Sequence, residues 1–218
     1  MKEKLKNNRN LRITVFVVLS IFIILILFNL FIERGLISKL ISKDEDDRGD
    51  DVFLYKPDYD YDILSDKEYL DLDRYIWFSD DGFSYVALVN DTAFKEAGSV
   101  AIFFGEYFDS IINGDYEKYN SFFSESYIDD KGLKEKFTMQ MLYNIKVFKV
   151  RQYTVDEGTA EQSTVYEYEV SYAIKYNNGT FRDDIESDVT RPQIYQLVEN
   201  DYTNIIKINS ITDYKYKT

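Results

Sequence analysis

The chemistry available to this chain is bounded by two side chains that it lacks. Its 218 residues include no Cys and no His, which excludes disulfides, thiol nucleophiles, imidazole acid–base catalysis and the usual zinc sites. Any reaction must use Asp, Glu, Tyr, Ser, Thr, Lys or Arg. The chain also holds 20 Tyr and 16 Phe, and tyrosine is common in protein interfaces because its ring buries area while its hydroxyl stays hydrogen-bonded. This composition favours a binding role, and we expect no cofactor.

A stripe of tyrosines supplies the candidate binding residues. Tyr166, Tyr168, Tyr172 and Tyr176 stand at even spacing with mostly polar residues between them, which places them on one face of a strand. Trp77, the single tryptophan, completes the candidate set. A tyrosine stripe is more typical of a core or an interface than of a catalytic centre. We therefore predict partner binding at these five residues, and no catalytic residue.

An acidic run offers a weak metal motif. Asp58, Asp60 and Asp62 alternate like the carboxylates that begin a calcium loop. The full loop needs Gly at its sixth position and Glu at its twelfth, and here these positions hold Ile63 and Tyr69. We therefore predict no metal site.

A continuous apolar stretch covers residues 13–32 and carries no charge. At a rise of about 1.5 Å per residue, a helix of this length spans roughly 30 Å, the thickness of the hydrocarbon core of a bilayer. Residues 1–12 hold five basic groups against one acid, and no small-residue cleavage site follows the stretch. The pattern predicts a single-pass transmembrane helix in the cell membrane, with a cytoplasmic basic tail and an extracytoplasmic C-terminal domain.

Acidic residues dominate the remainder of the chain. The formal net charge is −13, from 26 basic and 39 acidic residues, and this excess disfavours a nucleic-acid partner. Residues 33–73 are predicted to form a juxtamembrane segment and an acidic tether. Arg48-Gly49-Asp50 in this tether spells an adhesion tripeptide, but its acidic neighbours are typical of a solvated linker.

The periodicity of apolar residues predicts an α+β domain at residues 92–218. Steps of three and four from Phe94 indicate a helix that ends at Gly114, and Asp115 can cap a second helix. A third helix is expected at 132–144. The preceding residues 74–91 are predicted to form a hairpin or strap that extends the domain, with its turn at Asp80-Asp81-Gly82.

After residue 144 the apolar period changes from 3.6 to 2, which indicates antiparallel strands. The expected strands are 145–155, 166–176, 180–188, 193–199 and 205–214, with a hairpin turn at Asn177-Asn178-Gly179. The apolar phase slips at Val147-Phe148 and between Ile208 and Ile211, which predicts bulges. We therefore expect three helices packed on a curved, cone-shaped antiparallel sheet of four to five strands.

Two sequence segments carry a resemblance to a known fold. The helix end F-D-S-I-I-N-G-D-Y-E-K-Y at 108–119 and the turn N-N-G-T at 177–180 resemble those of the nuclear-transport-factor-2-like, or cystatin-like, fold. The likeness covers about residues 92–218. Membrane-anchored domains of this kind occur among the scaffold proteins of bacterial type IV secretion and conjugation machines, so the resemblance implies a protein partner and is compatible with a homo-oligomer.

The resemblance leaves a pocket enzyme as the alternative. Enzymes of the fold use Asp and Tyr in a conical pocket, as isomerases and dehydratases do, and Asp183 and Asp184 are the available acids. A cone filled with apolar side chains and lacking a buried carboxylate would argue against an enzyme. A cavity of several hundred Å³ lined by Asp and Tyr would favour one. The sequence favours a non-enzymatic, membrane-anchored interaction module.

Overall fold

The computed structural model describes residues 53–89, 91, 93–159 and 161–214. The predicted tail at 1–12, the predicted span at 13–32 and the tripeptide at 48–50 lie outside these residues. In the described part of the chain, no helix is both long and apolar enough to cross a membrane. The residues from Val52 onward form one compact unit.

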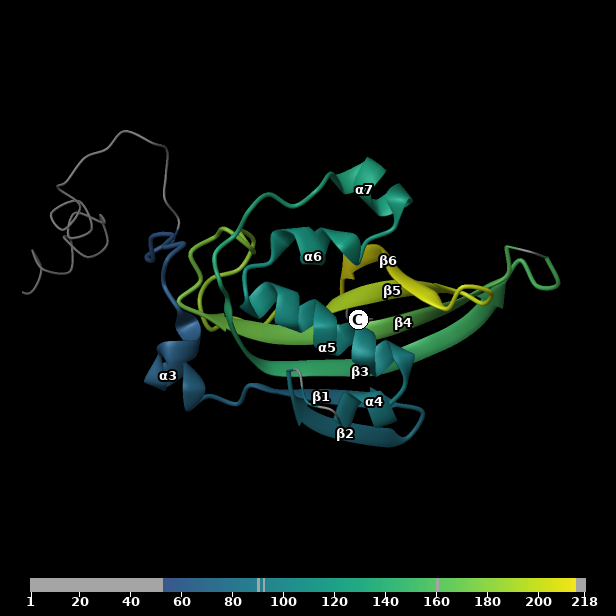
Figure 1. The fold of residues 1–218 in the computed structure, drawn as a ribbon, viewed down its shortest axis with the longest axis horizontal. Coiled ribbons are helices and arrows are strands. Elements are labelled where there is room, and N and C mark those ends of the chain that lie inside the picture. The colour runs from purple at the N-terminus through teal and green to yellow at the C-terminus, as the bar shows by residue number, and fades with distance from the viewer. Residues whose placement is uncertain (1–52, 90, 92, 160, 215–218) are drawn as a thin grey trace, which may run out of the picture. The chain divides into compact units, whose positions relative to one another are not determined.

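A six-stranded sheet forms the centre of this unit (Figure 1). Its strands are β1 (Tyr75–Asp80), β2 (Phe83–Leu88), β3 (Met141–Val155), β4 (Ser163–Lys175), β5 (Gln193–Asn200) and β6 (Ile205–Asp213), in the spatial order β2-β1-β3-β4-β5-β6. All neighbours are antiparallel except β1 and β3, which are parallel. The α+β class is confirmed, but the sheet is mixed and has six strands, so the predicted antiparallel sheet of four to five strands was wrong.

The hairpin at 74–91 accounts for this difference. Ile76 and Phe78 of β1 are buried, whereas Tyr75 and Trp77 between them are exposed. This alternation lets one face of β1 continue the core while its backbone pairs with β3. The hairpin is thus part of the sheet. Its predicted turn is confirmed, because Asp81 and the following glycine both have positive φ, as a type I′ turn requires.

The helices begin and end at local signals. They are α3 (Lys67–Leu70), α4 (Ala93–Glu96), α5 (Ser99–Ile112), α6 (Tyr116–Ser121) and α7 (Glu125–Lys131). The predicted first helix is divided into α4 and α5 at Gly98, whose φ of 98° and ψ of 175° are not helical. The second is confirmed as α6, where the Asp115 carboxylate accepts a hydrogen bond from Lys118 N at 2.9 Å.

The predicted third helix at 132–144 was wrong. The Ser124 hydroxyl caps Tyr127 N and starts α7 earlier in the chain, and Gly132, with φ of 78° and ψ of 172°, ends it. Residues 133–140 lead without a helix into β3.

The predicted strand at 180–188 is a loop. Asn177 is buried, and its Nδ2 donates to Arg182 O at 2.9 Å and to Ile185 O at 2.8 Å. These bonds fold the segment back on itself, so it does not extend along β4. The predicted bulge between Ile208 and Ile211 is confirmed by a register shift in the β5–β6 pair. On β3 the shifts fall on either side of Val147-Phe148 rather than at it.

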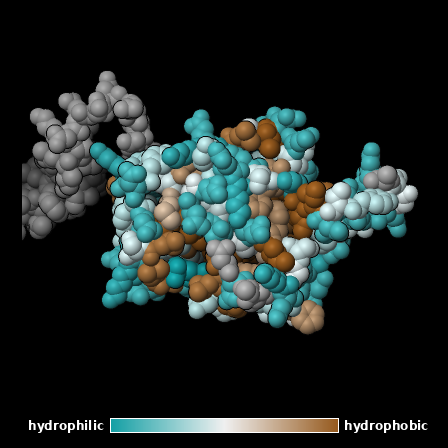
Figure 2. All heavy atoms as spheres, viewed as in Figure 1, coloured by the Kyte–Doolittle hydropathy of each residue, from teal (hydrophilic) through white to brown (hydrophobic). Residues whose placement is uncertain are grey.

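The helices α5 and α6 lie on one face of the curved sheet (Figure 1), and aromatic rings fill the space beneath α5. Phe104 and Phe108 of α5 contact Tyr168 and Tyr172 of β4, with ring centroids 5.3 and 6.0 Å apart. Edge-to-face packing of this kind stabilises a core beyond the area it buries. The projecting β3–β4 hairpin is mostly hydrophilic at its tip (Figure 2).

Candidate functional site

The structure separates the five predicted binding residues. Tyr168 and Tyr172 are buried in the core beneath α5. Trp77 is 45% exposed and alternates with the buried residues of β1, so it lies on the opposite face of the sheet. Tyr166 lines a pocket beside the β1–β2 turn, and Tyr176, directly after β4, lines a different pocket.

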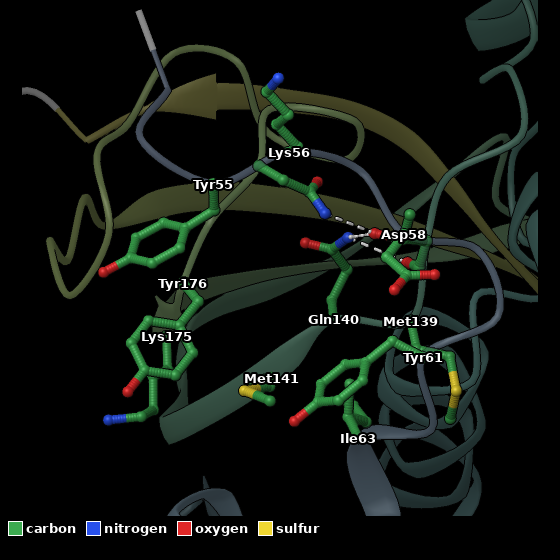
Figure 3. A pocket seen from close by; sticks show the side chains of 12 residues that line it. Tyr55, Lys56, Asp58, Tyr61, Ile63, Met139, Gln140, Met141, Lys175 and Tyr176 are labelled. Carbon is green, nitrogen blue, oxygen red and sulfur yellow. Dashed lines mark hydrogen bonds between the residues drawn. The ribbon is translucent and has the colours of Figure 1, made fainter. Parts of the chain in front are cut away.

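Tyr176 lines a pocket of about 320 Å³ that we call the tyrosine pocket (Figure 3). Three segments build it: residues 55–63, residues 138–141 at the entrance to β3, and residues 175–178 at the end of β4. Its apolar and aromatic lining comprises Tyr55, Tyr61, Ile63, Met139, Met141 and Tyr176. The volume is at the lower end of the roughly 300–1,000 Å³ of ligand pockets, which suits one large side chain of a partner.

The tyrosine rings that line the pocket are held by contacts at its edge. The Tyr176 hydroxyl donates to Glu68 Oε2 at 2.7 Å, and the Tyr61 hydroxyl donates to Asp66 Oδ2 at 2.6 Å. Each bond favours the protonated phenol and raises the pKa of its tyrosine. The Tyr55 ring lies 4.8 Å from that of Tyr176. These rings are therefore positioned before any ligand arrives.

A buried amide gives the pocket one polar point of recognition. Gln140 is only 2% exposed, and its Nε2 donates to Thr138 O and Oγ1 at 2.9 Å and to Thr180 Oγ1 at 3.3 Å. Its amide oxygen points away from these acceptors, towards the space between the tyrosines (Figure 3). Lys56 and Lys175 line the same pocket. The site can thus hold an apolar or aromatic group that carries a hydrogen-bond donor, with cations close by.

Most of these residues were not predicted from the sequence. Met139, Gln140 and Met141 fell in the expected third helix, and residues 55–63 fell in the expected tether. The alternating acids were the sequence signal that this segment is structured. Asp62 Oδ1 accepts a hydrogen bond from Leu64 N at 2.9 Å and so caps a short 3-10 helix at Ile63–Ser65. Alternate acids can therefore mark turns and caps as well as metal loops.

A second pocket lies beside the β1–β2 turn and the start of α5, and we call it the turn pocket. It has a volume of about 400 Å³ and is lined by Asp80, Asp81, Tyr166 and Lys149, among others. The Tyr168 hydroxyl donates to Asp80 Oδ2 at 2.7 Å. Lys149 Nζ lies 2.9 Å from Asp80 Oδ1 and 2.7 Å from Asp81 Oδ2. An Asp and a Tyr therefore meet here, as the enzyme alternative requires.

The acids that the sequence suggested for that enzyme lie elsewhere. Asp184 is held by Arg182, with two contacts of 2.5 and 2.6 Å, and by Arg191 at 3.1 Å. The hydrogen bonds from Arg182 hold the pKa of Asp184 below its usual value of 3.8. A carboxylate held in its charged form in this way stabilises the loop after β4 and is poorly suited to act as a base.

The resemblance to the nuclear-transport-factor-2-like fold stays a prediction from the sequence. Neither a protein-family model, nor a curated protein, nor a solved structure matches this chain.

Proposed function

We propose that this protein is a membrane-anchored, extracytoplasmic interaction module that serves as a scaffold and is not an enzyme. In this proposal residues 13–32 hold it in the cell membrane, and the domain binds a protein partner outside. A role in a secretion or conjugation-type assembly rests on the sequence resemblance alone.

The tyrosine pocket is the main structural support for the proposal. Its rings are tied in place by Glu68 and Asp66, so little conformational entropy is lost when a partner binds. Methionines at its base adapt to the shape of an inserted side chain, and the inward oxygen of Gln140 offers one directed hydrogen bond. Such a small aromatic site suits an anchor residue of a protein or peptide.

Site-specific photocrosslinking tests this proposal. A benzophenone amino acid in place of Tyr61 keeps an aromatic ring at the pocket, and the same amino acid in place of Tyr202, which is 66% exposed, serves as the control. In the native membrane we expect one discrete product from position 61, lost when Met141→Glu places a charge in the pocket. Equal products from both positions, or a product that survives Met141→Glu, would contradict the proposal.

The turn pocket supports a second candidate, a small-molecule site or pocket enzyme that uses Asp80. The buried Tyr168 would act through its hydrogen bond to the Asp80 carboxylate. Ligand-detected NMR of the full chain with a library of small polar fragments tests it. Fragments that lose binding in Asp80→Asn but retain it in Met141→Glu would support this candidate. Fragments with the opposite pattern would favour the tyrosine pocket.

A further inference from the structure

The two edges of the sheet differ in what covers them. At one edge, the segment between α6 and α7 pairs with β6: Ile208 N donates to Phe122 O at 2.8 Å, and Ser124 N donates to Ile208 O at 3.0 Å. At the other edge, β2 pairs only with β1, and no other described strand lies beyond it. Figure 1 shows β2 at the outer rim of the sheet. Leu88 O accepts a hydrogen bond from Asp91 N at 3.0 Å where the chain leaves β2. Before that point, no described strand pairs with the outward N–H and C=O groups of β2, so a further strand can be added there.

The residues of β2 lack the features that usually protect such an edge. Its sequence, Phe-Ser-Tyr-Val-Ala-Leu, contains no charge and no proline, and its pairing with β1 shows no bulge. Natural edge strands are commonly protected by lysine, proline or bulges. Phe83 is 69% exposed and Val86 is 45% exposed. Such an edge is suited to the addition of another strand.

An apolar patch continues from this edge onto the sheet face opposite α5. Val86 is paired with Trp77 of β1, which is also 45% exposed. Phe148 of β3 is 43% exposed and pairs with Ser79, two residues further along β1 on the same face. The open edge therefore adjoins exposed aromatic surface, and a strand added to β2 would extend both.

We propose that β2 pairs with β2 of a second copy of this chain, antiparallel and about a two-fold axis, to give one continuous sheet of twelve strands. An uncharged, apolar edge is matched by another uncharged, apolar strand, and β2 of a second copy is such a strand. The chain carries a net charge of −13, so most contacts between two copies would oppose acids, whereas β2 is neutral. Antiparallel pairing also keeps the acidic Asp80-Asp81 turns at opposite ends of the joined strands, about 20 Å apart at 3.4 Å per residue.

The two-fold axis also selects the register. Residues opposite each other in an antiparallel pair point to the same face. One residue must therefore lie opposite its own copy across the axis, because neighbours in sequence point to different faces. An axis at Val86 sets the two exposed Val86 side chains against each other, and an axis at Tyr85 would set Val86 against Ser84. Burial of apolar area favours the first. The two Trp77 patches then lie on the same side of the joined sheet.

Cysteine cross-linking of the full chain in membrane vesicles tests this pairing, because the native chain has no Cys. Val86→Cys should form a covalent dimer on mild oxidation, and Tyr202→Cys, at an exposed turn, should not. Equal cross-linking of the two variants would overturn the proposal.

A charged variant provides an independent measurement. Val86→Lys opposes two lysines at the axis, so photobleaching counts of labelled chains in sparse vesicles should change from two steps to one. Circular dichroism monitors folding, because Trp77 is paired with Val86 and its fluorescence would respond to the substitution itself. Wild-type chains that bleach in one step, or folded Val86→Lys chains that still bleach in two, would overturn the proposal.

Discussion

Substitution of Gly114 tests whether the close approach of its backbone positions the segment that lines the tyrosine pocket. It has a φ of 65°, and a Cβ there would lie 2.9 Å from Met139 N and 3.1 Å from Thr138 C. Both are backbone atoms of the segment that enters the pocket, so this segment would have to move. The left-handed conformation costs a residue with a Cβ about 1–2 kcal/mol, and overpacking adds about 1–3 kcal/mol. We expect Gly114→Ala to lower the free energy of unfolding by about 2–5 kcal/mol.

Gly158 provides the matched control. Its φ is 78°, but a Cβ there would meet no atom within 4 Å, so Gly158→Ala should cost only the conformational term of about 1–2 kcal/mol. Urea unfolding of the full chain in detergent, followed by the fluorescence of the single Trp77, measures both. Photocrosslinking from position 61 should also fall in Gly114→Ala alone. Equal losses of stability in the two variants would refute the reasoning that the close backbone approach positions Met139.

Three further results are expected. Tyr168→Phe removes a hydrogen bond to the carboxylate of Asp80 and should lower the free energy of unfolding by about 1.5–3 kcal/mol in urea titrations. Tyr107→Phe removes a hydrogen bond between two neutral hydroxyls and should lower the free energy of unfolding by only about 0.5–1.5 kcal/mol. A greater loss of stability in Tyr107→Phe than in Tyr168→Phe would contradict this ranking of the two bonds. Because the folded-state pKa of Asp184 is lowered, its contribution to stability is present above its unfolded pKa and is lost as the pH falls through the folded value. Asp184→Asn should therefore show a smaller loss of stability than wild type between about pH 5 and about pH 2 in the same titrations, and an unchanged slope would show that the arginine contacts do not stabilise the fold.

The parts of the fold that depend on local signals could be predicted from the sequence. The apolar spacing from Phe94 onward gave the helical region that includes α5, Asp115 gave the start of α6, and alternation gave β4, β5 and β6. The turn at Asp81 followed from its glycine neighbour. In each case the physical cause lies within a few residues: a cap, a turn conformation or the period of one element.

The parts that depend on distant contacts could not be predicted. The parallel pairing of β1 with β3 joins residues about seventy positions apart, such as Ile76 with Ile145, and nothing local specifies it. Asn177 reads as a turn residue, yet its buried side chain organises a loop. The tyrosine pocket likewise joins three separate segments. Of the predicted tyrosines, only Tyr176 lies there, because alternation identifies a face of a strand but not which of its residues a helix covers.

Thiol protection in intact cells most directly tests whether the domain is extracytoplasmic and binds a partner at the tyrosine pocket. It is measured with a membrane-impermeant maleimide on single-cysteine variants. Lys56→Cys lies at the tyrosine pocket, Tyr202→Cys at an exposed turn and Lys4→Cys in the predicted cytoplasmic tail. We predict that Tyr202→Cys is labelled at the same rate in cells and after purification. Lys56→Cys should be labelled more slowly in cells, where the partner covers the pocket, and Lys4→Cys only after permeabilisation. Labelling of Lys4→Cys in intact cells, or equal rates for Lys56→Cys in both settings, would contradict an extracytoplasmic domain that binds its partner at the tyrosine pocket.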